Sequence, residues 1–214
     1  IFYQKIRYCT IFSFKTHPKT NMDEIPDIID EVVKAKVKVF AFSRYVPTGG
    51  EVNISMTPEE YRKLLEVCDA KYKAYEKAGC EIYFNKKDHL WTLYEYETGQ
   101  FKFPESTETG MIYGGCNCGN CHITISSNGD IMACRRVTDS KEANIFEDRL
   151  ADIWICQMEK YRDYDKFIKC SKCELKAWCR GCPAVANGTN GDFYGVDPQC
   201  WKTRNKITGE VLPC

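Results

Sequence analysis

Apolar positions in the first part of the chain follow two periods, one typical of strands and one typical of helices. Residues 8–14 form an apolar run that predicts a strand, and residues 23–35 carry isoleucine and valine at helical spacing. Residues 37–43 alternate between apolar and other positions, which predicts a second strand before a turn at Pro47. The pattern therefore predicts a strand, a helix and a strand in succession.

The same succession continues after that turn. Thr57 and Glu60 form a capping box, which predicts the start of a long helix over residues 58–78, and residues 80–84 supply a third strand. The order β-α-β-α-β favours a parallel sheet with right-handed crossovers, so we expect an α/β fold. Three strands leave a sheet edge unpaired and cannot close a barrel, and the chain does not begin with Met. We therefore expect that it continues upstream.

The second half of the chain has a different pattern. Residues 91–115 are aromatic, polar and glycine-containing, which predicts a connector between a first region at 1–90 and a second region at 116–214. In the second region, apolar segments flank Asn128 and Gly129, and this dipeptide is the strongest short signal for a β-hairpin with a two-residue turn.

The hairpin sets an expected register. With those two residues at the centre of the turn, Cys134 lies opposite Ile123 and diagonal to Cys121, about 7 to 8 Å away. This separation is too long for a disulfide, whose Cα atoms lie about 4.4 to 6.8 Å apart, and it suits two thiolates that hold a larger group. Beyond the hairpin, residues 151–167 are typical of a helix, and the chain from Cys170 onward is predicted to be rich in loops.

The composition singles out cysteine as the residue with a chemical use. Thirty Lys and Arg balance thirty Asp and Glu, so the net charge indicates no nucleic-acid partner. No apolar run is long enough to span a bilayer and no signal peptide is evident, so we expect no membrane partner and a cytoplasmic location. Fourteen cysteines in 214 residues exceed what packing needs, and eleven of them follow residue 100. Four of the fourteen are more typical of buried apolar positions than of ligands, namely Cys9, Cys68, Cys80 and Cys156.

Two CxxC pairs and one later cysteine have the spacing of a metal site. The pairs are CSKC at 170–173 and CRGC at 179–182, and Cys200 follows them. Such pairs offer the four soft ligands that an iron–sulfur cluster or a structural zinc ion needs. Zinc stays open as an alternative on ligand type. Disulfides are the other alternative, and they would need an oxidising compartment.

A family resemblance appears when the earlier cysteines are added. Cys116 or Cys118, then Gly129, four residues and Cys134, followed by the two CxxC pairs, closely resemble the SPASM domain of radical-SAM peptide maturases. The resemblance covers about residues 116–201. One departure is the CRGC pair, which has two residues between its cysteines where the family usually has three.

This resemblance implies two auxiliary [4Fe–4S] clusters bound by interleaved cysteines. The first cluster would take four of five cysteines, namely Cys116, Cys118, Cys121, Cys134 and Cys182. The second would take Cys170, Cys173, Cys179 and Cys200. Cys116 and Cys118 compete for one ligand position, and the spacing to Cys121 favours Cys116.

The first region resembles the second half of a radical-SAM partial barrel. The implied fold is the C-terminal part of a partial (β/α)6 barrel, followed by a small cysteine-rich α+β SPASM domain with a β-hairpin. Residues 42–50 look like the sixth barrel strand and its turn, so Ser43 or Arg44 is a candidate for contact with S-adenosylmethionine or substrate. The alternative for Arg44 is a solvated or salt-bridged surface group, which is the more frequent role of an arginine beside a strand end. The CxxxCxxC loop that binds the catalytic cluster in that family is absent from the sequence. The resemblance therefore implies that S-adenosylmethionine and a third [4Fe–4S] cluster need an N-terminal part of the barrel that is missing here.

The resemblance also implies a function for the complete enzyme. Enzymes of this family cleave S-adenosylmethionine reductively, abstract a hydrogen atom from a peptide, and pass the remaining electron to an auxiliary cluster. The implied reaction is the oxidative crosslinking of a ribosomal precursor peptide, such as thioether formation, with a flavodoxin or ferredoxin as electron donor. The alternatives are side-chain oxidation like that of anaerobic sulfatase maturases, and a non-enzymatic, zinc-stabilised module that binds a peptide.

Overall fold

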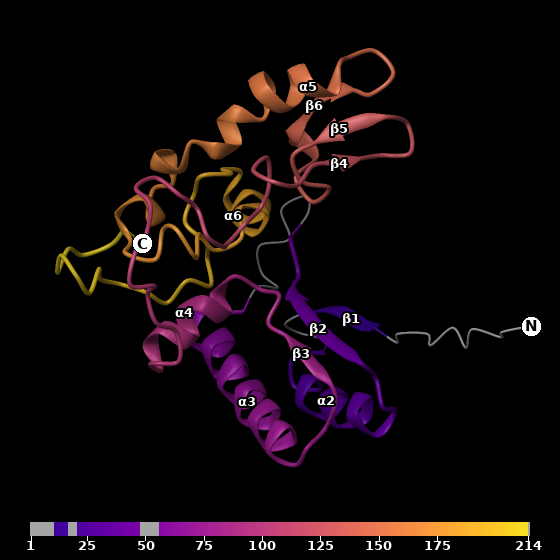
Figure 1. The fold of residues 1–214 in the computed structure, drawn as a ribbon, viewed down its shortest axis with the longest axis vertical. Coiled ribbons are helices and arrows are strands. Elements are labelled where there is room, and N and C mark those ends of the chain that lie inside the picture. The colour runs from indigo at the N-terminus through magenta and orange to yellow at the C-terminus, as the bar shows by residue number, and fades with distance from the viewer. Residues whose placement is uncertain (1–10, 17–20, 48–55, 214) are drawn as a thin grey trace, which may run out of the picture.

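The computed structural model describes residues 11–16, 21–47 and 56–213. Figure 1 shows two regions, a parallel sheet with its helices and a cysteine-rich region built mostly from turns and short elements. Three features of the sequence lie outside the described residues, namely Cys9, Cys214 and the turn predicted after Pro47.

Three parallel strands form the sheet of the first region, in the order β1-β2-β3. β1 (Ile11–Thr16) pairs with β2 (Val39–Arg44), and β2 pairs with β3 (Tyr83–Asn85). The predicted order of elements and the parallel pairing are confirmed. Because parallel strands end at the same edge, the carboxyl ends of β2 and β3 lie side by side.

Two helices cover this sheet from the same side, α2 (Ile25–Lys34) and α3 (Pro58–Lys77) (Figure 1). The predicted capping box at the start of α3 is confirmed. Glu60 N donates to Thr57 Oγ1 at 3.2 Å, and Thr57 N donates to Glu60 Oε2 at 2.8 Å.

Aromatic residues dominate the core between the sheet and these helices. The rings of Tyr72 and Phe84 stack with centroids 4.1 Å apart, and Phe40 meets Tyr72 edge-on at 6.4 Å. Phe42 meets Trp91 edge-on at 6.3 Å. All five side chains are buried, and one continuous cluster holds them.

A helix that the sequence did not predict, α4 (Leu90–Glu97), follows β3. It lies within the residues predicted as an irregular connector, yet it packs on the core of the first region through Leu90, Trp91, Leu93 and Tyr94. Its polar residues are few and interleaved with aromatics, so no clear apolar stripe marks it as a helix in the sequence.

The second region contains a small antiparallel sheet of β4 (Thr124–Ile125), β5 (Asp130–Met132) and β6 (Lys141–Asn144). Its strands are two to four residues long. Sheets this small need packing or ligation from elsewhere to be stable.

The β4–β5 hairpin differs by one residue from the predicted register. Ser126 N donates to Asp130 O at 2.9 Å, so three residues and not two form the loop. Gly129 N donates to Ser126 O at 3.0 Å, and Gly129 has a φ of +87°. A three-residue loop of this kind ends on a left-handed residue, which glycine adopts without strain. The predicted pairing of Cys134 with Ile123 is therefore wrong.

The prediction of one helix at 151–167 is also wrong, because the structure divides this segment into short helical turns. They are α5 (Leu150–Asp152), the π-helical turn η3 (Ile153–Gln157), and the 3-10 turns η4 (Glu159–Arg162) and η5 (Tyr164–Lys166). Met158 N donates to Ile153 O at 3.0 Å across the π turn, and both side chains are then buried in the same small core.

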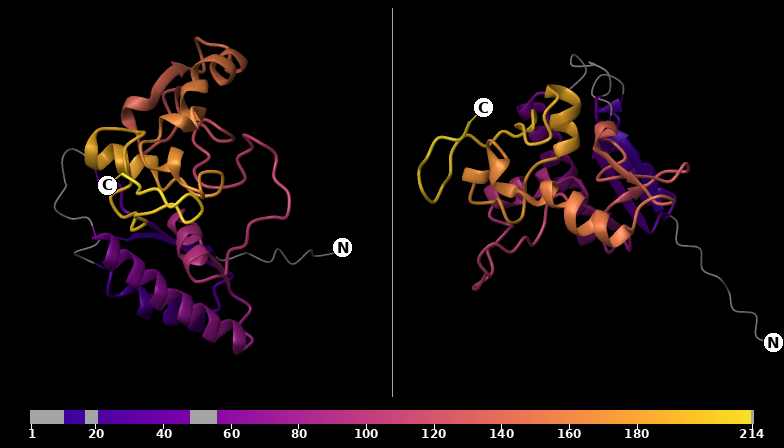
Figure 2. Two further views of the ribbon diagram at one scale, coloured as in Figure 1. Left: turned by 90° about the vertical axis from the view of Figure 1, so that its left-hand side faces the viewer. Right: turned by 90° about the horizontal axis from the view of Figure 1, so that it is seen from above.

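The remaining elements lie around the cysteines. They are the 3-10 turns η2 (Thr138–Ser140) and η6 (Cys170–Lys172) and the helix α6 (Pro183–Asn190), which the sequence did not predict. In the left view of Figure 2, the yellow C-terminal segment lies beside the first region, and Leu175 and Cys179 pack in the core of that region.

The three described cysteines outside the predicted ligand groups have different surroundings. Cys68 is buried in the first core as expected, and Cys80 is half-buried and packs against that core. Cys156 is exposed, so the expectation that it is buried is wrong. Within the described residues, no helix combines the length and apolar character needed to cross a membrane.

Candidate metal centres

Four of the predicted ligands line a single cavity where the two regions meet. They are Cys170, Cys173, Cys179 and Cys200. Short turns hold them, because Cys173 N donates to Cys170 O at 3.1 Å and Cys200 N donates to Asp197 O at 3.0 Å. We call these four residues the distal cysteine group.

The walls of this cavity are apolar and carry two basic residues. Leu93 of α4, Leu175 and Leu212 supply the apolar surface. Lys169 is buried and donates to Cys200 O at 3.1 Å, whereas Lys202 forms a buried ion pair with Glu174 at 2.9 Å. Asp197 also lines the cavity, so the distal cysteine group lies in a poorly solvated site with charges of both signs close by.

Burial determines the charge of these thiols. It raises the pKa of Cys170 and Cys200, and it raises the pKa of Cys173 to about 11. Buried thiols therefore stay protonated unless a metal centre compensates the thiolate charge. Four soft donors around one mostly apolar cavity, with the buried Lys169 to offset part of the negative charge, fit an iron–sulfur cluster. Among the residues that the structure describes, no three His, Cys, Asp or Glu side chains converge on a single-ion site.

A second cavity, of about 530 Å³, contains cysteines of the other predicted group. Cys116, Cys118 and Cys134 line it, together with Ser43 from the carboxyl end of β2. The Cys118 thiol lies within interaction distance of both other thiols. This proximity lowers the pKa of Cys116 and lowers the pKa of Cys134 to about 5, while it raises the pKa of Cys118.

Cys182 packs beside Cys134 of this group, whereas Cys121 is exposed and does not line the cavity. Cys182 is buried at the N-terminus of α6 and shares a small apolar cluster with Cys134. Arg136 Nη2 lies 3.7 Å from Cys182 Sγ. Cys121 is exposed, and its backbone N donates to Asn117 O at 3.2 Å. Of the five cysteines predicted for the first cluster, three thus line one cavity and Cys182 packs beside one of them. We call Cys116, Cys118, Cys134 and Cys182 the proximal cysteine group.

Arg180 connects the two cysteine groups, because it follows Cys179 of the distal group and hydrogen-bonds to the backbone at Cys116 of the proximal group. The sequence did not identify this residue as important. Its guanidinium donates to Gly114 O at 2.8 Å and to Cys116 O at 3.0 Å. Gly115 has a φ of +79°, and a Cβ there would lie 3.1 Å from the same guanidinium. The CRGC pair, which departs from the family spacing, therefore places its arginine against the chain at Cys116.

A buried ion-pair network connects β2 to the cysteine-rich region. Arg44 donates to Asp197 through two bonds, of 2.6 and 2.8 Å, and to Asp88 at 2.9 Å. Arg44 also donates to Gln199 Oε1 at 2.8 Å. Burial alone would lower the pKa of Arg44, but the two carboxylates hold that pKa well above its ordinary value. Asp197 Oδ2 in turn accepts from Cys182 N at 2.7 Å.

This network explains the position of Arg44. The side chain is 2% exposed, and the bonds to Asp88, Asp197 and Gln199 occupy its guanidinium. The contact of Ser43 or Arg44 with S-adenosylmethionine or substrate stays a prediction. The sequence did not identify Asp88 or Asp197 as partners of Arg44, because they are 44 and 153 residues away along the chain and no local pattern reports such a contact.

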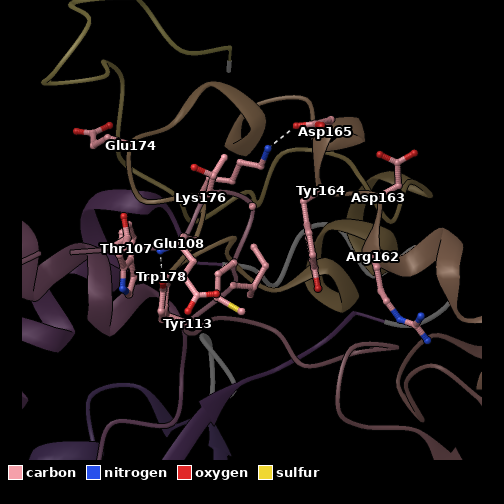
Figure 3. Close-up of a pocket in the computed structure, with 15 residues that line it drawn as sticks. Thr107, Glu108, Tyr113, Arg162, Asp163, Tyr164, Asp165, Glu174, Lys176 and Trp178 are labelled. Atoms are coloured by element: carbon pink, nitrogen blue, oxygen red, sulfur yellow. Dashed lines mark hydrogen bonds and ion pairs between the residues drawn. The ribbon is translucent and has the colours of Figure 1, made fainter. Parts of the chain in front are cut away.

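A third cavity, of about 490 Å³, opens beside the segment that leads to Cys116 (Figure 3). Trp178 stacks on Tyr113 with ring centroids 5.6 Å apart, and Tyr164 lies under the Arg180 guanidinium at 4.6 Å. Lys176 is directed at Asp165 and forms an ion pair with it. The charges of this cavity include both signs.

Comparisons with known proteins agree with the cysteine spacing. Residues 116–183 match the SPASM family, described as an iron–sulfur cluster-binding domain. The AdoMet-dependent heme synthase of Methanosarcina barkeri is 24% identical over 192 residues, which are 86% of this chain and 54% of that protein. The SPASM match ends before Cys200.

Solved structures share the fold. SuiB of Streptococcus suis bound to S-adenosylmethionine has a TM-score of 0.61 and 22% identity, over 90% of this chain and 45% of SuiB. The protein anSMEcpe with bound AdoMet has a TM-score of 0.59 and 16% identity, over 88% of this chain and 49% of that one. The chain therefore spans about half the length of the proteins it matches, and its mixed α/β fold resembles their C-terminal parts. Together, these findings show a SPASM iron–sulfur cluster-binding domain at residues 116–183 and, for the chain as a whole, the fold of SuiB and anSMEcpe.

Proposed function

We propose that this chain is the C-terminal part of a radical S-adenosylmethionine enzyme that crosslinks a ribosomal peptide, for example through a thioether. The observation that carries the proposal is the presence of two separate cysteine groups, each at its own cavity, within a SPASM-type region. SuiB, one of the proteins with this fold, has been solved bound to its precursor peptide SuiA, which supports a peptide substrate.

The distal cysteine group is proposed to bind one auxiliary [4Fe–4S] cluster. When bound, such a cluster accepts and returns one electron at a potential set by charge, hydrogen bonds and solvent access. In this chain, Lys169 holds positive charge at the cavity, and Leu93 excludes water from it.

The proximal cysteine group is proposed to bind the other auxiliary cluster, with Cys116, Cys118, Cys134 and Cys182 as its four ligands. Cys116 and Cys118 then both serve, instead of competing for one position. Cys121, which the sequence included, is proposed to be dispensable because it is exposed and does not line the cavity.

The complete enzyme is proposed to hold S-adenosylmethionine and a third cluster with residues that precede this chain. A flavodoxin or ferredoxin is proposed as its electron donor. The chain would then have three parts. The first is a part of the barrel that includes α4, the second is a connector, and the third is the SPASM region from residue 116.

Matched cysteine variants test the proposed ligands. Cys118→Ala should lose about four of eight irons per chain under anaerobic reconstitution, because one cluster loses a ligand. Cys121→Ala and the buried control Cys68→Ala should keep their iron. If Cys121→Ala loses iron and Cys118→Ala keeps all of its iron, then Cys121, and not Cys118, is a ligand of this cluster.

The reaction is tested with the chain extended to the full length of its relatives. That enzyme, incubated with S-adenosylmethionine, a reductant and its precursor peptide, should yield a peptide that has lost two hydrogen atoms. Conversion of a Cys or Ser side chain to an aldehyde would instead support the sulfatase-maturase-like alternative. An unmodified peptide with fully loaded clusters would refute peptide modification, and zinc in place of iron would support the binding module.

A second candidate is chemistry on a tetrapyrrole. The relative from Methanosarcina barkeri is an AdoMet-dependent heme synthase, and the match covers most of this chain. Turnover of a tetrapyrrole by the extended enzyme, without turnover of peptides, would favour this candidate.

A further inference from the structure

The cavity at the proximal group contains more than cysteines. One wall comes from the carboxyl edge of the parallel sheet, where Ser43 lies in β2 and Lys87 follows β3. The other wall comes from the cysteine-rich region, where Arg135 and Arg136 follow Cys134 directly. In open parallel sheets, ligands bind outside the carboxyl ends of the strands, so this is the side on which a substrate is expected.

All the charged residues that line this cavity are basic. They are Lys87, Arg135 and Arg136, with His122 beside them, and no Asp or Glu among the described residues lines it. This is not a consequence of overall composition, because the chain has a formal net charge of zero. The cavity beside Trp178 has acidic and basic residues together. A cleft lined by one sign of charge concentrates ligands of the opposite sign.

The basic residues differ in what they already contact. Arg136 Nη2 lies 3.7 Å from Cys182 Sγ, so this arginine can offset charge on the proximal group. Lys87 and Arg135 are exposed, and neither side chain has a hydrogen bond or ion pair with any described residue. Two cations therefore face the cavity without an internal partner in the described part of the chain.

We propose that this cavity binds a carboxylate of the substrate, with Arg135 and Lys87 as its charged partners and the Ser43 hydroxyl as a further donor. The proposal rests on the proposed function, because it names the substrate class of the same site. Arginine suits a carboxylate because its planar guanidinium can donate two parallel hydrogen bonds. The carboxylate can come from a Glu or Asp side chain of a peptide or from a propionate of a tetrapyrrole.

Binding to the iron-loaded 214-residue chain tests this proposal by equilibrium dialysis. One pair of ligands is a hexapeptide of alternating Gly and Glu, blocked at both ends, and the same peptide with Gln for Glu. The other pair is coproporphyrin III, which has four carboxylates, and its tetraamide. The wild-type chain should prefer the carboxylate member of one pair, and its affinity should fall as salt is added. The preferred pair identifies the source of the carboxylate.

Variants locate the binding site. Arg135→Gln should weaken carboxylate binding about tenfold, and the double variant with Lys87→Gln should weaken it further, because each removes a charged hydrogen-bond donor. Arg149→Gln and Lys102→Gln remove exposed cations elsewhere and should leave binding unchanged.

Two outcomes would overturn the proposal. One is equal binding of the acid and amide members in both pairs. The other is unchanged binding in Arg135→Gln with a shifted reduction potential of the clusters, which would mean that these cations serve the cluster alone. Iron content is measured on the same samples, so a failure of the proposed function appears as missing iron and not as missing carboxylate preference.

Discussion

The parallel-sheet region buries its aromatic and aliphatic residues in one continuous core, whereas the cysteine-rich region divides its own between two smaller clusters. The first region has helices of ten and twenty residues, and the second has strands of two to four residues joined by single turns. Apolar burial can explain why the first region folds. The second region has too little of it, which indicates that ligation by its cysteines contributes to folding.

The two regions are not independent, however. Leu175 and Cys179 belong to the core cluster of the first region, and Arg44 extends from β2 to Asp197. The distal cysteine group therefore lies on a surface that the first region already makes rigid, whereas the proximal group is attached through Arg180 and the Arg44 network.

Removal of the clusters should give the largest effect, and only in one region. After oxidative destruction of the clusters and chelation of iron, amide hydrogens of residues 116–200 should exchange about 100-fold faster or more, because metal binding there supplies folding free energy. Amides of α2 and α3 should be unaffected. Hydrogen exchange read by mass spectrometry makes this comparison, and equal protection before and after iron removal would show that the second region folds without metal.

Breaking the link between the regions should have the next largest effect. Asp197→Asn leaves the buried Arg44 with one carboxylate, and we expect a loss of about 3 kcal/mol in the free energy of unfolding. Urea denaturation of the iron-loaded chain measures this loss. The control Lys34→Gln breaks an exposed pair with Glu31 and should leave the urea midpoint unchanged. An unchanged midpoint in Asp197→Asn would show that the network does not hold the regions together.

A contact inside the first region should matter least. Asp30 of α2 accepts from Lys71 at 2.6 Å and from Tyr75 at 2.7 Å, both on α3. The bond from Lys71, followed by that from Tyr75, lowers the pKa of Asp30 below its ordinary value of 3.8. This stabilisation is therefore present above pH 3.8 and is lost as the pH falls through the lowered pKa.

Asp30→Asn should lower the free energy of unfolding by less than about 1 kcal/mol at neutral pH. Urea midpoints of the variant and the wild type should converge as the pH falls below the pKa of the carboxyl in the unfolded chain. A difference that persists in acid would mean that packing, and not the carboxylate charge, accounts for the effect.

Much of the first region could be predicted because its pattern is local. The apolar period of α2, the capping box of α3 and the order of strands all depend on residues close in sequence. The helix α4 was missed because aromatic residues occupy several of its faces and obscure the period.

The candidate site could be predicted in composition but not in detail. The four distal cysteines that share a cavity were predicted from the resemblance to the SPASM domain, because the spacing of the CxxC pairs alone would group Cys182 with them in place of Cys200. The hairpin register was wrong because the loop takes three residues with Gly129 in the left-handed region. The pairing of Arg44 with Asp197 joins residues 153 positions apart, and no local pattern reports such a contact.

Quantification of iron and acid-labile sulfide in the chain purified without oxygen tests the central claim most directly. Two [4Fe–4S] clusters predict about eight irons and eight sulfides per chain, with a brown colour from absorption at about 400 nm. A colourless, iron-poor chain that nevertheless protects the amides of residues 116–200 would contradict the account.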